Sequence, residues 1–157
     1  MLRWISRSVG AAGSHSRSLL GNAGGASAIE FALVAPVFLA MSIGMLKFGV
    51  AISQYMIVTN AAAAGATTFA LSRGTNTPYG TTTTAITSAA PSLTVASITK
   101  TLRVSGTACT DDTTCKTALV AGATATVTVS YPCDLTVMGH DFKSNCTVSS
   151  TSAQMVQ

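Results

Sequence analysis

The chain has 157 residues and a net charge of +4; 48% of its residues are hydrophobic and only 9% are charged. This length allows one modest domain beside a membrane segment, and so little charge is unusual for a fully soluble domain. Three of the nine basic residues precede residue 26, which leaves six basic and five acidic residues in the remainder. This balance excludes a basic face for nucleic acid, and we expect no nucleic-acid partner.

Residues 1–25 read MLRWISRSVGAAGSHSRSLLGNAGG and combine arginine with glycine and serine, without an acidic residue. Such a composition is typical of a targeting leader rather than of a folded element. We therefore assign residues 1–25 to a cytoplasmic leader peptide.

A long apolar segment follows the leader. The sixteen residues from Phe31 to Leu46 carry no charge, and Lys47 is the one charged residue from Phe31 to Val58. A bilayer-spanning helix needs roughly 20 mainly apolar residues, so the segment is long enough to span. Because the arginines of the leader precede it, the positive-inside rule places the N-terminus in the cytoplasm and the C-terminal region across the membrane.

An ordinary secretory signal is the alternative for this segment, with an apolar core over Leu33–Gly44 and a cut near Ala61–Ala64. The apolar run continues past Lys47 to Ile57, however. That run is longer than the usual signal core of roughly 7 to 15 residues, which favours a retained anchor.

The helix is expected to extend well beyond the bilayer, over residues 26–73. No strong stop signal occurs before Gly74, and the alanines at Ala61–Ala64 are good helix formers. Pro36 removes one backbone hydrogen bond inside this helix. Lys47 then lies near the outer interface, where its long side chain either reaches water or forms an ion pair.

Residues 74–91 are rich in glycine, proline and threonine, which predicts a linker. This linker has room for one short helix, over Thr83–Ala90.

Residues 92–157 are expected to form a small extracytoplasmic β domain. A first strand is predicted over Leu93–Val104, with a bulge or a strand start near Ala96. The clearest strand is Ala123–Cys133, because apolar residues alternate there with threonine and serine. A last strand over Cys146–Met155 completes a sheet of three strands, the minimum for stability. The fold class is therefore α+β, a long N-terminal transmembrane helix that extends into a small antiparallel β-sheet domain.

The four cysteines, Cys109, Cys115, Cys133 and Cys146, all lie on the far side of the membrane in this topology. An even number in an oxidising compartment predicts two disulfides that staple the domain. Pairing each cysteine with its neighbour in sequence would close a turn and tie two strands together, but four cysteines permit three connectivities. A zinc site is the alternative; neither pair has the short spacing of a metal knuckle, so we predict no metal and no cofactor.

The sequence predicts no enzyme, because it contains no constellation of catalytic side chains. His15 lies in the leader, and His140 beside Asp141 is adjacency in sequence rather than the geometry of a triad. Neither a phosphate-binding loop nor a Gly-x-Ser-x-Gly motif occurs. Asp111 and Asp112 are expected to be solvated turn residues rather than calcium ligands.

The stretch Gly25-Ala26-Ser27-Ala28-Ile29-Glu30-Phe31 resembles the processing motif of Flp/Tad-type pilins and pseudopilins. The ALVAPVF that follows resembles the TadE-like subset, the minor pseudopilins of the tight-adherence system. The resemblance implies that a prepilin peptidase cuts after Gly25 and leaves Ala26 as the new N-terminus. It also implies that Glu30 and Phe31 occupy the positions of the assembly contact.

Glu30 has a physical reason to act in such a contact. An unpaired carboxylate at the edge of a membrane is costly unless a cation or hydrogen-bond donor approaches it. The new amino group of Ala26 on a neighbouring subunit would supply that cation. The alternative is that Glu30 only complements the helix dipole, which is worth about 0.3 to 1 kcal/mol.

The resemblance implies a minor pseudopilin that assembles, initiates or caps a type IV pilus of the Flp/Tad class. Its implied partners are a prepilin peptidase, the major pilin and other minor pseudopilins, an inner-membrane assembly platform and the lipid bilayer. Its implied location is the bacterial inner membrane, as a single-pass protein with a periplasmic domain, or the pilus itself. The competing hypothesis is a signal-anchored or secreted small β-domain adhesin or binding module with no role in assembly.

Overall fold

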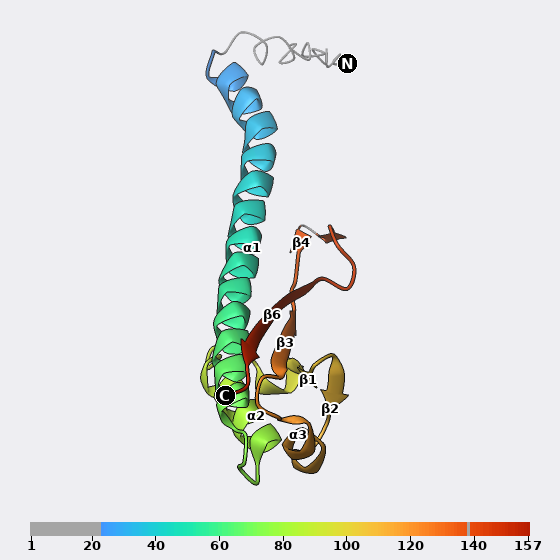
Figure 1. The fold of residues 1–157 in the computed structure, drawn as a ribbon. Helices are drawn as coiled ribbons and strands as arrows, with labels where there is room; N and C mark the ends of the chain where they lie inside the picture. The colour runs from blue at the N-terminus through green and yellow to red at the C-terminus, as the bar shows by residue number, and fades with distance from the viewer. Residues whose placement is uncertain (1–22, 138) are drawn as a thin grey trace, which may run out of the picture. The chain divides into compact units, whose positions relative to one another are not determined.

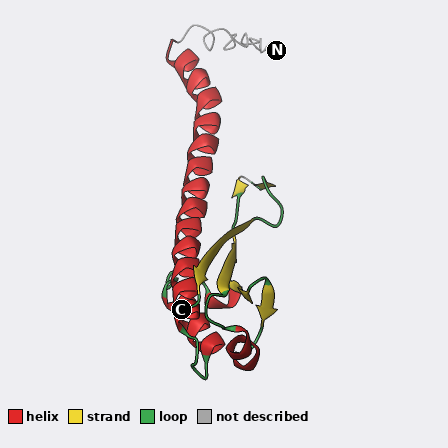
Figure 2. Ribbon diagram, viewed as in Figure 1, coloured by secondary structure: helices red, strands yellow, loops and turns green. Residues whose placement is uncertain are grey.

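The computed structural model describes residues 23–137 and 139–157 (Figure 1). These residues divide between two compact units, 1–41 and 42–157, which we describe separately. The predicted leader therefore lies outside the described residues, except for its last three. Figure 2 separates the helices from the strands in the same view. The helices are α1 (Ala23–Leu71), α2 (Pro78–Ser88), the 3-10 helix Val95–Ser97 and α3 (Asp112–Ala118). The strands are β1 (Thr99–Val104), β2 (Thr107–Cys109), β3 (Thr124–Pro132), β4 (Thr136–Val137), β5 (His140–Asp141) and β6 (Thr147–Met155).

In the first unit, all described residues belong to α1, which continues through Pro36. Pro36 removes one backbone hydrogen bond, but it does not end the helix. In the second unit, α1 ends at Leu71, two residues earlier than predicted. Gly74, the expected stop signal, adopts a φ of +79°, a conformation that glycine accepts without strain.

The last four turns of α1 supply one wall of the hydrophobic core. The buried side chains on this part of the helix are mostly small: Val58, Ala61, Ala62, Ala66, Phe69 and Ala70. Gly65 lies among them, and a Cβ added to it would come within 2.6 Å of Ile86 Cγ1 and 3.2 Å of Val127 Cγ1. The backbone of α1 thus approaches Ile86 of α2 and Val127 of β3 so closely that a side chain at residue 65 would force Ile86 to shift.

The sheet that faces this wall has four antiparallel strands in the order β2-β1-β3-β6. Strand β3 lies inside it, with Val127 opposite Leu102 on one side and Ser152 on the other. Ala125, Val127 and Val129 are fully buried, as the alternation along this strand predicts. The α+β fold, with its long apolar helix and small antiparallel sheet, is confirmed.

The segment 74–91 is not a plain linker, because most of it forms α2 (Pro78–Ser88), which begins five residues before the short helix we expected. Pro78 is favourable in the first turn of a helix, where its missing N–H would have no partner anyway. The hydroxyl of Thr82 donates to the carbonyl of Pro78 over 2.7 Å, and other threonines of α2 make similar bonds. Because Ile86 is buried in the core, packing outweighs the low helix propensity of the threonine run.

Other elements also differ from the prediction. The expected bulge near Ala96 is the 3-10 helix Val95–Ser97, and β1 begins after it. The hairpin between β1 and β2 turns at Ser105 and Gly106, with φ of 48° and 85°. Two consecutive positive φ angles are typical of the tight turns that match the twist of a hairpin. A separate two-stranded sheet, β4 with β5, lies between β3 and β6 in the chain.

Candidate functional site

An apolar surface covers α1 before it reaches the core. Large apolar side chains are exposed there on all sides of the helix: Ile29, Phe31, Leu33, Val34, Val37, Phe38, Leu39, Met41, Ile43, Met45, Leu46, Phe48, Val50, Ile52 and Met56. A helix that is apolar all round belongs in a core or in a membrane, and these side chains lie in no core. By length and composition, the part of α1 from Ser27 onward can cross a membrane.

Glu30 is the one acidic residue on this surface. It is exposed, and its neighbours Ile29 and Phe31 are 66% and 74% exposed. Within the described part of the chain, no cationic side chain forms an ion pair with Glu30. The cation that would neutralise a carboxylate at a membrane edge is therefore not supplied by the described side chains. Gly25 and Ala26 precede it by one to two turns, in the first residues of α1.

Lys47 ends the uncharged part of α1 and forms an ion pair with Asp134. The Lys47 Nζ lies 2.5 Å from Asp134 Oδ2, which follows β3. Of the two roles left open by the sequence, the structure shows the ion pair. The pair lies in a groove whose apolar walls are Ile43, Leu46 and Val50.

The pair changes the acidity of Asp134. The hydrogen bond from Lys47 holds the pKa of this carboxyl far below its ordinary value, and the backbone N–H of Thr136 lowers the pKa further. A carboxyl with a lowered pKa in the folded state stabilises the fold above its ordinary pKa. This contribution is lost as the pH falls toward the lowered pKa.

We therefore expect the Asp134→Asn variant to unfold at a lower temperature than the unchanged protein at neutral pH. The difference should shrink as the pH falls below about 4, where Asp134 of the unfolded chain becomes protonated. Thermal unfolding of the full chain in detergent micelles, followed at several pH values, measures both effects. Asp141→Asn is the matched control, because Asp141 is exposed and forms no ion pair within the described residues. An Asp134→Asn difference that stays constant into acid would contradict the assigned ion pair.

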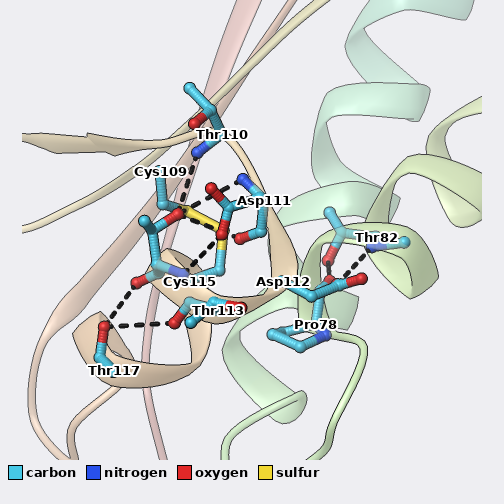
Figure 3. The surroundings of a disulfide bond; sticks show 11 residues. Pro78, Thr82, Cys109, Thr110, Asp111, Asp112, Thr113, Cys115 and Thr117 are labelled. Atoms are coloured by element: carbon cyan, nitrogen blue, oxygen red, sulfur yellow. Dashed lines mark hydrogen bonds between the residues drawn. A yellow bond between two sulfur atoms is a disulfide. The ribbon is translucent and has the colours of Figure 1, made fainter.

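The first disulfide joins Cys109, at the end of β2, to Cys115 in α3 (Figure 3). Asp111 lies between them and begins α3: its carboxylate accepts from the Thr114 N–H over 2.8 Å, and the Thr114 hydroxyl accepts from the Asp111 N–H. Hydrogen bonds from this capping box lower the pKa of Asp111, with the Thr114 N–H as the main cause. Asp111 is exposed as predicted, but it caps a helix rather than lying in a simple turn.

For Asp112, the prediction of a solvated turn residue is wrong. It is half-buried in the first turn of α3, and its carboxylate accepts from the Gly80 N–H over 2.9 Å. Figure 3 shows Asp112 directed toward α2, beside Pro78 and Thr82. Asp112 therefore connects α3 to α2 instead of being a freely solvated residue.

The second disulfide joins Cys133 to Cys146. Each of the two bridges therefore connects a cysteine to the next cysteine along the chain. The Cys133 N–H also donates to the Cys146 carbonyl over 3.0 Å, next to the paired ends of β3 and β6. This bridge closes a loop that contains β4 and β5; we call its described residues, 133–137 and 139–146, the closed loop. Among the described residues, no group of three or more potential metal ligands comes together.

The apolar helix can be compared with known families. Residues 25–67 match the sequence profile of the family described as TadE-like protein. Residues 25–67 are TadE-like. No curated protein and no solved structure gave a match. The TadE-like segment begins at Gly25 and ends within α1, so it contains Glu30, Lys47 and the first part of the wall that packs on the sheet. The family indicates a role associated with the Tad pilus machinery.

The structure places the residues singled out by the sequence in two groups. Gly25, Ala26, Glu30 and Phe31 lie within the first turns of the TadE-like helix, and the four cysteines form the two bridges of the second unit. Sequence reasoning missed Asp134 as the partner of Lys47, because 87 residues separate them. It also missed Gly65, for which the available signal was a glycine inside the alanine-rich stretch of residues 61–66.

Proposed function

We propose that the protein is a minor pseudopilin of the Tad pilus system, cut after Gly25 by a prepilin peptidase. The observation that supports this proposal is that the TadE-like segment begins at Gly25. The family match starts at the glycine of the motif and continues through the exposed apolar part of α1. The cleavage site, the membrane anchor and the start of the distal domain then follow one another along α1. By the distal domain we mean the sheet, α2, α3 and the last four turns of α1.

The proposed topology has the N-terminus in the cytoplasm, α1 in the bacterial inner membrane and the distal domain in the periplasm. Two features support it independently of the motif. The arginines of residues 1–25 precede the span, as the positive-inside rule requires for this orientation. Both disulfides belong to the distal domain, and disulfides persist in oxidising compartments such as the periplasm.

Glu30 is proposed as the residue that sets the register between subunits. After cleavage, the amino group of Ala26 would lie one turn from the carboxylate on the same helix and within reach of the carboxylate of a neighbouring helix. Near a low-dielectric region, such a pair is strongly favoured over either charge alone. The lack of a cationic partner for Glu30 among the described residues supports a partner from another subunit, such as the major pilin or a second minor pseudopilin.

The mature N-terminus tests the proposal. We expect intact-mass and N-terminal peptide analysis to find a chain that begins at Ala26 when a prepilin peptidase is co-expressed. The matched control is Gly25→Leu, which places a bulky side chain at the cut and should leave the full chain intact. A mature chain that begins beyond Ala61 would support the secreted adhesin instead, and an uncut chain in the presence of active peptidase would refute the processing step.

A further inference from the structure

The closed loop begins at the level of α1 where the uncharged run ends. Sixteen uncharged helical residues precede Lys47, and they rise by about 24 Å, close to the roughly 30 Å of bilayer hydrocarbon. In the topology proposed above, Lys47 therefore lies at the outer edge of the hydrocarbon. Asp134, paired with Lys47, brings the start of the closed loop to the same level.

Phe142 is held close to this level by the pairing of the loop with itself. Thr136 pairs with Asp141 and Val137 with His140, and the Phe142 N–H donates to the Leu135 carbonyl over 3.4 Å. Leu135 directly follows Asp134 in the chain. The backbone of Phe142 is thus connected to the Lys47–Asp134 pair through one hydrogen bond and one peptide unit.

The side chain of Phe142 is 72% exposed, although it is aromatic. Outside α1, it is the most exposed large apolar residue in the described part of the chain; the others are Val95, Val120 and Met155. Val120 lies two residues after the end of α3, which Figure 1 shows at the end of the domain opposite β4. An exposed aromatic side chain therefore lies on the closed loop, whose start is paired with Lys47 at the end of the uncharged run.

We propose that the closed loop is a second membrane contact, in which Phe142 enters the headgroup region of the outer leaflet beside α1. The apolar ring of phenylalanine can enter the boundary between the headgroups and the acyl chains, as it does on interfacial helices. The loop carries Asp141 and Lys143, whose charges balance, so the contact does not need anionic lipid. The ion pair fixes the depth of the loop, and the disulfide Cys133–Cys146 limits how far its base can open. This proposal rests on the membrane topology of the proposed function.

Single tryptophan reporters can test the contact in vesicles of phosphatidylcholine alone. The chain has one tryptophan, Trp4, so a Trp4→Phe background makes each introduced reporter unique. The test variant is Phe142→Trp. The matched control is Val120→Trp, at a position that is 59% exposed, and Leu39→Trp reports whether α1 is inserted.

The full chain is reconstituted with lipids that carry a quenching spin label either near the headgroup or near the end of the acyl chain. We expect the shallow label to quench Phe142→Trp at least about twofold more strongly than Val120→Trp, because only the former enters the interface. The deep label should quench Leu39→Trp most strongly. Equal quenching of Phe142→Trp and Val120→Trp, with Leu39→Trp still quenched, overturns the loop contact and leaves the topology intact; in that case Phe142 faces water or a protein partner. Absence of quenching for Leu39→Trp overturns the topology itself.

Discussion

Replacing Glu30 with alanine should reduce the assembly of the cleaved subunit by on the order of a hundredfold or more. Removing one partner of a desolvated ion pair leaves the other charge uncompensated, at a cost of about 3 to 5 kcal/mol. The other charge here is the amino group of Ala26 in the neighbouring subunit. Recovery of cleaved subunits in pilus fractions, or bound to pilin partners in detergent extracts, measures the effect.

The size of the Glu30→Ala effect distinguishes the two roles considered for this carboxylate. If Glu30 only complements the helix dipole, the loss is about 0.3 to 1 kcal/mol, a change of roughly two- to fivefold. Glu30→Gln provides the matched control, because it keeps the length of the side chain and removes only the charge. Only chains that begin at Ala26 are counted, so a defect in cleavage is not mistaken for a defect in assembly. Unchanged assembly of Glu30→Ala would refute the pairing hypothesis.

The substitution Phe69→Ala should lower the free energy of unfolding of the distal domain by about 3 to 5 kcal/mol. Phe69 is fully buried in the core at the end of α1, and its truncation leaves a cavity in that core. Domains of this kind have total stabilities of about 5 to 15 kcal/mol, so the variant should lose a large share of its stability. Denaturant unfolding of the full chain in micelles, with both disulfides intact, provides the measurement.

Leu71→Ala is the matched control for Phe69→Ala. Leu71 lies two residues further along the same helix but is 60% exposed, so its truncation should change the stability by no more than about 0.5 kcal/mol. Similar losses for the two variants would show that Phe69 does not pack as the structure describes.

The sequence predicted best those features that depend on local patterns. The alternation along Ala123–Cys133 depends only on which face of a strand is buried, and β3 follows it closely. The long apolar run of α1 was likewise visible in a short stretch of sequence. The four cysteines predicted two disulfides, but the sequence left three connectivities open and the structure decides between them. The turn at Ser105 and Gly106 was also visible in principle, because glycine after a small polar residue favours a tight hairpin.

The features that could not be predicted depend on partners far away in the chain. The threonines of α2 disfavour a helix by themselves, and Ile86 overrides them only through its place in the core beside Gly65. Lys47 gave no sign of Asp134, because an ion pair across 87 residues leaves no local pattern. For Glu30, the described part of the chain offers no cationic side chain in an ion pair, so its role stays a prediction about a second molecule.

The contact at Gly65 also has a mechanical consequence. Sliding α1 by one turn, about 5.4 Å, would bring Ala61 or Phe69 to the place where Ile86 and Val127 leave no room for a side chain. The helix therefore cannot slip past the sheet by one turn without displacing Ile86 and repacking the core. A force applied along this part of α1 is therefore transmitted to the core of the distal domain, and the domain moves together with the helix.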